Sequence, residues 1–560
     1  MGLLDPTPPP FDPLDWVTKP FAERGAMMCR AWALQGYGTP LAAYAVYALK
    51  IAFYIGAWVA FCSLSPSLGG PSEIASWWLD PIAFQKAILW SLLFEILGLG
   101  CGSGPLTGRY FPPVGGFLYF LRPGTTKLPL FPGMPLLGGR TRGPLDVVAY
   151  ATLIGIVLVA LCSATVPYWA IASVAVLVPL LGVTDRTLFL AARGEHYWTT
   201  VVCMLFSSWI AGAQAVQLAL WFWAGVSKLN HHFPTVVCVM NSNGPLTRFE
   251  SLRKRFYRSY PDDLRPSRLA TWLAHIGTAH EMTVPLLFIA AGFGWLGPHG
   301  LTIAVVVMLA LHVYITSNVP MGVPLEWNFM VVYGAFALFW AHPEVTFLQV
   351  DLGLAPLLVV MLLVLPAVGN LWPHQLSFLL AMRYYAGNWA YGVWLFEGES
   401  YRKLERLTTS APWIYDQLAH FYDRGTSVGL VGKVLAFRMM HLHGRILARV
   451  IPKAVDRFED YEYLDGELVA GMALGWNFGD GHLHNEHLLD AVQKQCGFEP
   501  GELRCVFVES QPLGKSTMQW RIVDAADGEL ERGEVDVAEL RRVQPWEAAQ
   551  AASSSPSGNI

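Results

Sequence analysis

Three ionisable side chains lie inside long apolar stretches of this 560-residue sequence, where such groups are costly unless they have a function or a partner. Lys228 lies near the end of the run AVQLALWFWAGVSKL, Glu281 within TWLAHIGTAHEMTVPLLFI, and His312 within LALHVYI. A desolvated lysine can lose its proton near neutral pH and act as a general base. A carboxylate and an imidazole nearby could orient the amine or relay its proton. The sequence therefore offers Lys228, Glu281 and His312 as candidate catalytic residues.

The run before Lys228 has a polar face if it forms a helix. At 100° per residue, one face collects Gln214, Gln217, Trp221, Gly225 and Lys228. We therefore expect Gln217 and Trp221 to help bind a ligand beside the lysine. The alternative is a snorkelling lysine, whose aliphatic side chain extends so that the charged amine lies at the membrane surface.

Glu281 precedes a proline by one helical turn. Pro285 cannot donate to the carbonyl of Glu281, so a kink and a cavity are expected there. His280 and Asn328, each within or beside an apolar run, are further candidate ligand-binding residues. A lone histidine in such a run is more often a packing residue.

The composition predicts a membrane protein, because 54% of the residues are hydrophobic and only 14% are charged. Apolar runs long enough to span a bilayer predict an all-α polytopic membrane bundle of about nine spans, followed by a C-terminal soluble α+β module. The expected spans are 41–64, 82–100, 147–164, 169–190, 199–228, 270–293, 301–319, one beginning at Glu326, and 352–371.

The expected domains follow the change in composition along the chain. They are an N-terminal cytoplasmic arm (1–40), the transmembrane helical domain (41–396), an amphipathic or helical connector (397–458), the soluble module (459–546) and a disordered tail (547–560). Within them, residues 378–396 suit an interfacial helix or a tenth span, and 505–509 and 518–523 read as strands.

The distribution of Lys and Arg predicts the topology. The loop at 65–81 has none, whereas 101–144 carries Arg109, Arg122, Lys127, Arg140 and Arg142, which places that loop and the N-terminus in the cytoplasm of a bacterial plasma-membrane protein. An odd number of spans then puts the C-terminal module outside. Either a re-entrant segment at 233–240 or a span at 378–396 would reverse this.

A histidine-rich run offers a second candidate site. His482, His484 and His487 could hold a metal ion together with Asp480 or Glu486. The alternative, which the spacing favours, is a polar loop with Asp480 or Asn485 capping the next helix. Cys496 and Cys505 could be a disulfide or two free thiols. The CGSGPLTG run from Cys101 lacks the order of a phosphate-binding loop and reads as a turn-rich segment.

Net charge excludes one class of partner. A net charge of −4 and an isoelectric point near 6.4 give no reason to expect nucleic acid. The expected partners are membrane lipids and other proteins of the cell envelope.

The phrases FWAGVSKL, HEMTVPLL and LHVYI resemble the horizontally transferred transmembrane domain superfamily, which includes vitamin K-dependent gamma-carboxylase, over residues 149–371. The resemblance implies that Lys228 deprotonates a reduced quinone or another acidic lipid headgroup, helped by Glu281 and His312. Carboxylation is not implied, because the C-terminal part is shorter than the carboxylase's and no glutamate-rich substrate is evident. The whole chain also resembles an uncharacterised bacterial multi-span membrane family.

Three classes of function therefore remain open. An enzyme acting on a lipid or quinone needs the three candidate catalytic residues to meet at one cavity. A scaffold or assembly factor of the cell envelope needs only the spans and a binding module. A transporter of lipids or small molecules needs discontinuous helices and internal repeats, and the two halves of the sequence show no convincing repeat.

Overall fold

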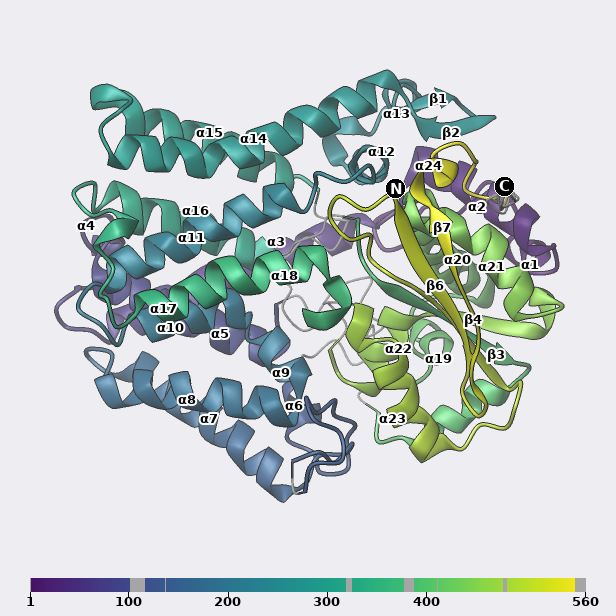
Figure 1. Ribbon diagram of the computed structural model, residues 1–560, viewed down its shortest axis with the longest axis horizontal. Helices are drawn as coiled ribbons and strands as arrows, with labels where there is room; N and C mark the ends of the chain where they lie inside the picture. Colours follow the sequence, from purple (N-terminus) through teal and green to yellow (C-terminus); the bar gives the residue numbers. More distant parts are fainter. Residues whose placement is uncertain are drawn as a thin grey trace, which may run out of the picture.

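The computed structural model describes residues 2–100, 116–135, 137–318, 325–376, 387–409, 411–476 and 481–548. Long helices lie side by side in one half of the molecule, here called the helical layer (residues 41–100 and 144–371) (Figure 1). A five-stranded sheet and its helices form the other half, the sheet module (residues 387–548). Four features singled out above lie outside the described residues: the Cys101 run, segment 378–386, Asp480 and the tail beyond residue 548.

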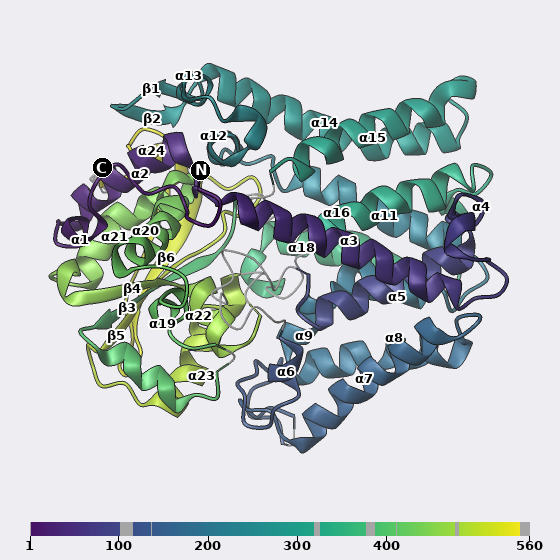
Figure 2. The ribbon, with the colours of Figure 1, turned by 180° about the vertical axis from the view of Figure 1, so that it is seen from behind.

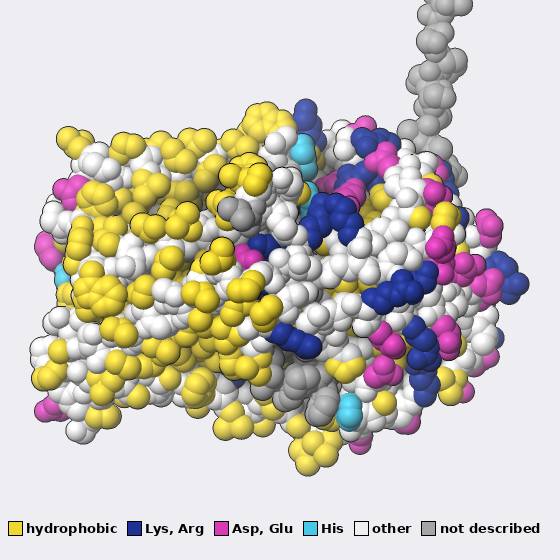
Figure 3. Space-filling model, turned by 90° about the horizontal axis from the view of Figure 1, so that it is seen from below, with side chains coloured by type: hydrophobic (Ala, Val, Ile, Leu, Met, Phe, Trp, Pro, Cys, Tyr) yellow, Lys and Arg dark blue, Asp and Glu magenta, His cyan; other side chains and the backbone are white. Residues whose placement is uncertain are grey.

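The helical layer consists of helices packed side by side. Its helices are α3 (Leu41–Ser63), α5 (Pro81–Ile96), α7 (Pro144–Cys162), α8 (Tyr168–Thr184), α9 (Arg186–Ala191), α10 (Thr199–Cys203), α11 (Trp209–Val226), α14 (Arg268–Gly292), α15 (Gly300–Thr316), α16 (Leu325–Gly334), α17 (Ala355–Val359) and α18 (Leu365–Leu371). Short turns join some of them, such as α7 with α8 and α14 with α15. On the face seen in Figure 3, apolar side chains cover this half, whereas Lys, Arg, Asp and Glu gather over the sheet module. The contrast matches a half that faces lipid and a half that faces water.

The expectation of nine spans is not supported. Among the residues described, four helices are long and apolar enough to cross a membrane: Leu41–Ser63, Pro144–Cys162, Trp209–Val226 and Gly297–Thr316. Three shorter apolar helices accompany them at Tyr168–Thr184, Leu325–Trp340 and Ala355–Leu371. Charged groups and breaks within the predicted runs account for the difference.

The predicted span at 199–228 shows how such a break arises. The structure divides it into α10 and α11, with the chain reversing between them. At the reversal, both the N–H and the hydroxyl of Ser208 donate to Asp351, at 3.0 and 2.6 Å. A polar anchor at this point ends one helix and begins the next, which hydropathy averaged over the run does not reveal.

Helix α11 also satisfies backbone carbonyls on its neighbours. Two wide π-helical turns, η6 (Ala335–Trp340) and η8 (Val360–Val364), interrupt the regular bonding of the helices beside it. The Gln214 amide donates to the Leu338 carbonyl at 2.8 Å, and the Trp223 indole donates to the Leu362 carbonyl at 2.7 Å. Both bonds supply partners that lipid could not provide.

The sheet module is built on an antiparallel sheet of order β4-β3-β5-β6-β7. Its strands are β3 (Tyr391–Glu397), β4 (Tyr461–Asp465), β5 (Leu503–Val508), β6 (Thr517–Asp524) and β7 (Gly528–Asp536). The strands expected at 505–509 and 518–523 are confirmed as β5 and β6. The helix or tenth span expected at 378–396 is wrong for residues 391–396, which form strand β3. This run is buried on both faces, so its unbroken apolar sequence resembles that of a span.

The N-terminal residues belong to the sheet module and do not form a separate arm. Helices α1 (Pro13–Trp16) and α2 (Phe21–Gln35) pack on α20 (Arg424–Met440), as Figure 2 shows from behind. The buried Lys433 amine donates to the carbonyls of Thr7 and Tyr37, at 2.5 and 3.1 Å. Both termini therefore lie at one end of the helical layer. The opposite placement expected from an odd number of spans is wrong.

The remaining elements connect or cover these parts. They include α12 (Phe233–Asn243), α13 (Glu250–Lys254), the hairpin of β1 (Tyr257–Ser259) and β2 (Asp263–Pro266), α19 (Ile414–Leu418), α21 (Leu447–Ala454), α22 (Gly466–Ala473), α23 (Glu486–Cys496) and α24 (Val537–Leu540). The segment at 233–240, expected as a possible re-entrant loop, forms most of α12. This buried helix packs against α2 and α14.

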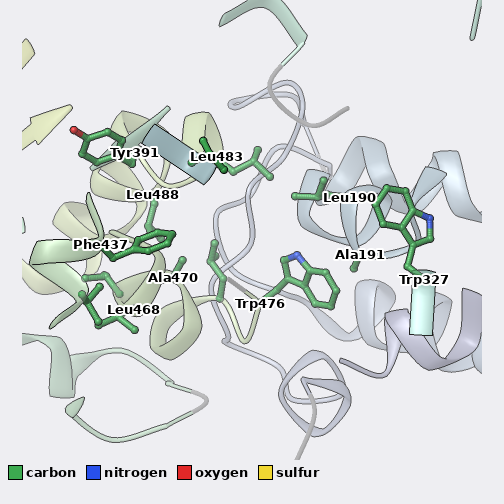
Figure 4. Close-up of a cluster of buried hydrophobic side chains, with 14 of the residues drawn as sticks. Leu190, Ala191, Trp327, Tyr391, Phe437, Leu468, Ala470, Trp476, Leu483 and Leu488 are labelled. Atoms are coloured by element: carbon green, nitrogen blue, oxygen red, sulfur yellow. The ribbon is translucent and has the colours of Figure 1, made fainter. Parts of the chain in front are cut away.

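One apolar core joins the two halves. Trp476 lies between residues of the sheet module, such as Leu468 and Leu483, and residues of the helical layer, such as Leu190 and Trp327 (Figure 4). The Tyr119 hydroxyl also donates to the Ala473 carbonyl across this junction. The shared core holds the cavity described next in a fixed position relative to the sheet.

Candidate functional site

A cavity of about 160 Å³ lies among α11, α12, α14, α15 and α16, near the end of the helical layer that meets the sheet module. Most of its lining is apolar or aromatic. The three candidate catalytic residues all line it, together with Leu220, Trp221, Ala224, Phe233, Val236, Met240, Gly277, Leu311, Tyr314, Ile315, Trp327, Asn328, Val331 and Trp389. The structure thus brings Lys228, Glu281 and His312 to one cavity.

The Lys228 amine forms an ion pair with the Glu281 carboxylate. It also donates to the Ala224 carbonyl at 3.2 Å and lies 5.7 Å from the centre of the Phe233 ring. The Lys228 side chain is only 8% exposed, so it does not extend to the membrane surface. The amine is paired with an acid, because a lone charge among apolar side chains would be far more costly.

A close helix contact makes this pairing possible. A Cβ atom at Gly225 would lie 2.5 Å from Cγ of Met282, so only glycine lets α11 approach α14 this closely. Lys228 follows the last residue of α11 by two positions, and Glu281 lies next to Met282 on α14. The partial negative charge of the helix C-terminus adds to the attraction for the ammonium group.

His312 is held by two other residues of the cavity wall. The Trp221 indole donates to Nε2 of His312 at 3.0 Å, so Nδ1 must carry the ring proton. Nδ1 then donates to the Asn328 side-chain oxygen at 2.5 Å. Asn328 in turn donates to the His312 carbonyl, at 3.2 Å, and to the Thr316 hydroxyl. Both ring nitrogens are occupied, so the imidazole positions Trp221 and has no ring nitrogen left to bond to the Lys228 pair.

The predicted ligand-binding residues divide into two groups. Trp221 and Asn328 line the cavity, whereas Gln217 and His280 do not. Gln217 packs tightly against Gly334, and His280 bonds to the Val307 carbonyl at 2.8 Å between α14 and α15. Helix α14 continues past the proline that was expected to kink it and ends at Gly292.

A second polar cluster next to the cavity was missed. Arg193 pairs with Glu95 at 2.8 Å, and Lys50 pairs with Glu326 at 3.0 Å. Lys50 and Glu95 lie inside predicted spans, so the cost of placing a charge in lipid could have identified them from sequence.

Trp327 connects this cluster to the cavity. Its indole donates to Nδ1 of His196 at 2.9 Å, and the Arg193 guanidinium lies 4.4 Å from its ring centre. The same residue lines the cavity. A change in the charges of the Arg193–Glu95 cluster or of the Lys228–Glu281 pair would therefore act on the same residue of the cavity lining, Trp327.

The histidine-rich run forms a polar network in the sheet module. His482 pairs with Glu509, and Arg521 binds Glu509 at 2.6 Å and Glu486 at 2.5 Å. Burial raises the pKa of Glu509, but His482 and Arg521 outweigh it and bring the pKa to about 2. Asn485 caps α23, as the alternative interpretation expected.

A metal site at this run gains no support from the geometry. His484 is buried while His487 is exposed, and in the described part of the chain no three His, Cys, Asp or Glu side chains are grouped as metal ligands. Cys496 and Cys505 are buried free thiols, so they are not joined in a disulfide.

Comparison with known proteins places the whole chain in one family. Residues 1–555 match the family described as transmembrane protein of unknown function (DUF3556). The chain belongs to this family. No curated protein and no solved structure matches it. Membership establishes a transmembrane protein, and the function of this DUF3556 member has to be argued from its site.

The pairing of Lys228 with Glu281 predicts strong coupling between the two residues. We expect Lys228→Met and Glu281→Gln each to lower the free energy of unfolding by about 3 kcal/mol, because each leaves one polar partner without the other. The double variant should lose at least about 1 kcal/mol less than the sum of the two. Unfolding by sodium dodecyl sulfate in mixed micelles measures all four proteins; strictly additive losses would contradict the pairing.

Proposed function

We propose that this transmembrane protein is a multi-pass protein of a bacterial plasma membrane and an enzyme whose cavity binds the polar head of a lipid or quinone. Lys228 is the base of the proposed reaction, and Glu281 is its proton partner. The observation that carries the proposal is the Lys228–Glu281 pair in the wall of an otherwise apolar cavity. A pair of ionisable groups in a mostly apolar pocket is typical of functional sites.

The size and lining of the cavity favour a lipid-soluble ligand. Its volume of about 160 Å³ is less than the roughly 300–1,000 Å³ of pockets that enclose whole drug-sized molecules. The cavity would therefore take a head group or a single ring while the tail stays outside. Tyr314 of α15, which is 44% exposed, also lines the cavity. Aromatic side chains of Trp221 and Phe233 suit a flat ring.

The pair offers a route for moving a proton. Transfer of one proton from the Lys228 ammonium group to the Glu281 carboxylate would give a neutral amine beside a carboxylic acid, and the contact between the two groups supplies the path for that transfer. When the proton is on Glu281, the neutral Lys228 amine can take a proton from a ligand hydroxyl. The products are the ligand anion, the Lys228 ammonium group beside it and protonated Glu281. The ammonium group then stabilises the anion that it has formed.

The resemblance of FWAGVSKL and HEMTVPLL to the carboxylase-containing superfamily supports the same assignment of roles to Lys228 and Glu281. His312 has a different role in this proposal. Because its ring is bonded to Trp221 and Asn328, it holds the aromatic wall of the cavity in place.

Ligand retention tests the proposal. After purification in mild detergent, we expect solvent extracts of the wild type to contain a lipid or quinone that is depleted at least about tenfold in Lys228→Met and Glu281→Gln. Mass spectrometry of the extracts measures it, and a short-chain hydroquinone added to the apo protein should raise the unfolding temperature of the wild type only. Lys127→Met is the matched control, because it breaks a buried lysine–carboxylate pair, with Asp146, outside the cavity.

Equal lipid content in all four proteins, with no hydroquinone response, would contradict the proposed enzyme. The same result would favour the scaffold interpretation, which needs no occupied cavity.

We also propose that the sheet module lies in the cytoplasm. The connections at the end of the helical layer farther from the module contain no Lys or Arg: 64–80, 163–167, 204–208, 293–299 and 341–354 (Figure 1). At the other end, the connections carry Arg122, Lys127, Arg140, Arg142 and the basic segment 248–268. Loops rich in Lys and Arg stay inside the cell, which supports this orientation.

Cysteine labelling tests the orientation in intact cells. In a Cys162→Ser background, which removes an exposed native thiol, a membrane-impermeant maleimide should label Ser72→Cys from outside. It should label Ser251→Cys only after the cells are permeabilised. Both positions are exposed in the structure. Labelling of Ser251→Cys in intact cells would place the module outside and contradict the proposal.

A further inference from the structure

A strongly basic segment leads from α12 to α14. Residues 248–268 contain seven Lys and Arg against three Asp and Glu, a net charge of +4. Arg253 is buried, and Arg265 pairs with Asp263 at 2.6 Å. The other five cations are exposed: Arg248, Lys254, Arg255, Arg258 and Arg268. We call these five residues the basic surface.

Large apolar side chains project among these cations. Leu246 is 74% exposed, Phe249 is 61% exposed and Trp272 is 67% exposed. An ordinary solvated charged face would not show such side chains to water. Side chains of this kind beside Lys and Arg are typical of segments that lie in the interface of a membrane.

The positions of Arg268 and Trp272 on α14 support a location of the basic surface at the membrane interface. Arg268 is the first residue of α14, and Trp272 lies one turn later, about 6 Å along the axis. Leu273 and Ile276 follow on the helix exterior and are exposed apolar residues of the helical layer. The boundary between lipid tails and headgroups therefore passes close to Trp272, which puts Arg268 at headgroup level.

Hydrogen bonds fix the segment to both ends of the chain. Arg253 donates to the carbonyls of Thr247, at 2.8 Å, and Leu34, at 2.5 Å. On the other side, the Leu264 N–H donates to the Gln544 side-chain oxygen at 2.9 Å. The basic surface is therefore held in place before any lipid binds, which lowers the entropic cost of binding.

We propose that the basic surface binds the anionic headgroups of membrane lipids, while Leu246, Phe249 and Trp272 enter the adjoining acyl region. Each cation near an anionic bilayer contributes about fivefold in affinity, so five on one rigid segment select strongly for anionic lipid. The apolar side chains between them favour a membrane over nucleic acid or an acidic protein. This inference concerns a surface separate from the Lys228 cavity and does not depend on the chemistry proposed there.

Lipid selection in nanodiscs tests the inference. Full-length protein is placed in nanodiscs that contain equal amounts of phosphatidylglycerol and phosphatidylcholine with the same acyl chains. The protein is then released from the nanodiscs, and native mass spectrometry counts the lipids of each kind that stay bound to it. We expect the wild type to prefer phosphatidylglycerol. The ratio of retained phosphatidylglycerol to phosphatidylcholine should be at least about fivefold lower in the variant Arg248→Gln/Lys254→Gln/Arg255→Gln/Arg258→Gln.

A matched control removes the same charge elsewhere. Arg402, Arg457, Lys494 and Arg532 are exposed cations of the sheet module, and their replacement by Gln should change the preference less than twofold. Salt provides a second measurement that needs no variant: raising NaCl from about 0.05 to 0.5 M should weaken the wild-type preference.

Two results would overturn the inference. One is an unchanged preference in the basic-surface variant or at high salt. The other is capture of short duplex DNA through the same four cations by wild-type protein in phosphatidylcholine nanodiscs, together with no preference for phosphatidylglycerol in the mixed nanodiscs.

Discussion

Polar groups inside the helical layer must find their partners within the protein, because lipid tails offer none. Helix α11 meets this constraint on several sides. Gln214 and Trp223 bond to carbonyls in the wide turns of neighbouring helices, and Trp221 bonds to His312. At its end, Lys228 pairs with Glu281. The packing of the layer around α11 thus follows from the same requirement that builds the candidate site.

The ion pair changes what the lysine can do. In the proposed reaction the amine becomes a base by passing its own proton to the carboxylate with which it is paired. Glu281 provides that place within contact distance, and Gly225 brings the two helices close enough for it. His312, bonded on both sides, leaves the pair free to exchange its proton with a ligand.

The sequence predicted the meeting of Lys228, Glu281 and His312, because three costly groups in apolar runs are most easily explained by a shared site. Strands β5 and β6 also followed from local patterns. The predictions that failed concern features with no local signal in the sequence. Strand β3 is buried on both faces and reads like a span, and the anchor of Ser208 on Asp351 joins residues 143 positions apart. The placement of both termini at one end likewise depends on contacts between distant segments. Lys50 and Glu95 did have a local signal, as charges in apolar runs, but their partners Glu326 and Arg193 lie far away in the sequence.

The most direct test of the account is a cryo-electron microscopy map of protein purified without removal of lipid, compared with a map of the Lys228→Met/Glu281→Gln double variant. The account predicts non-protein density in the cavity of the wild type, in contact with Lys228 or Glu281, and no such density in the variant with the same fold. The account would be contradicted if both maps resolve lipids around the helical layer but show the same cavity with no bound molecule in it.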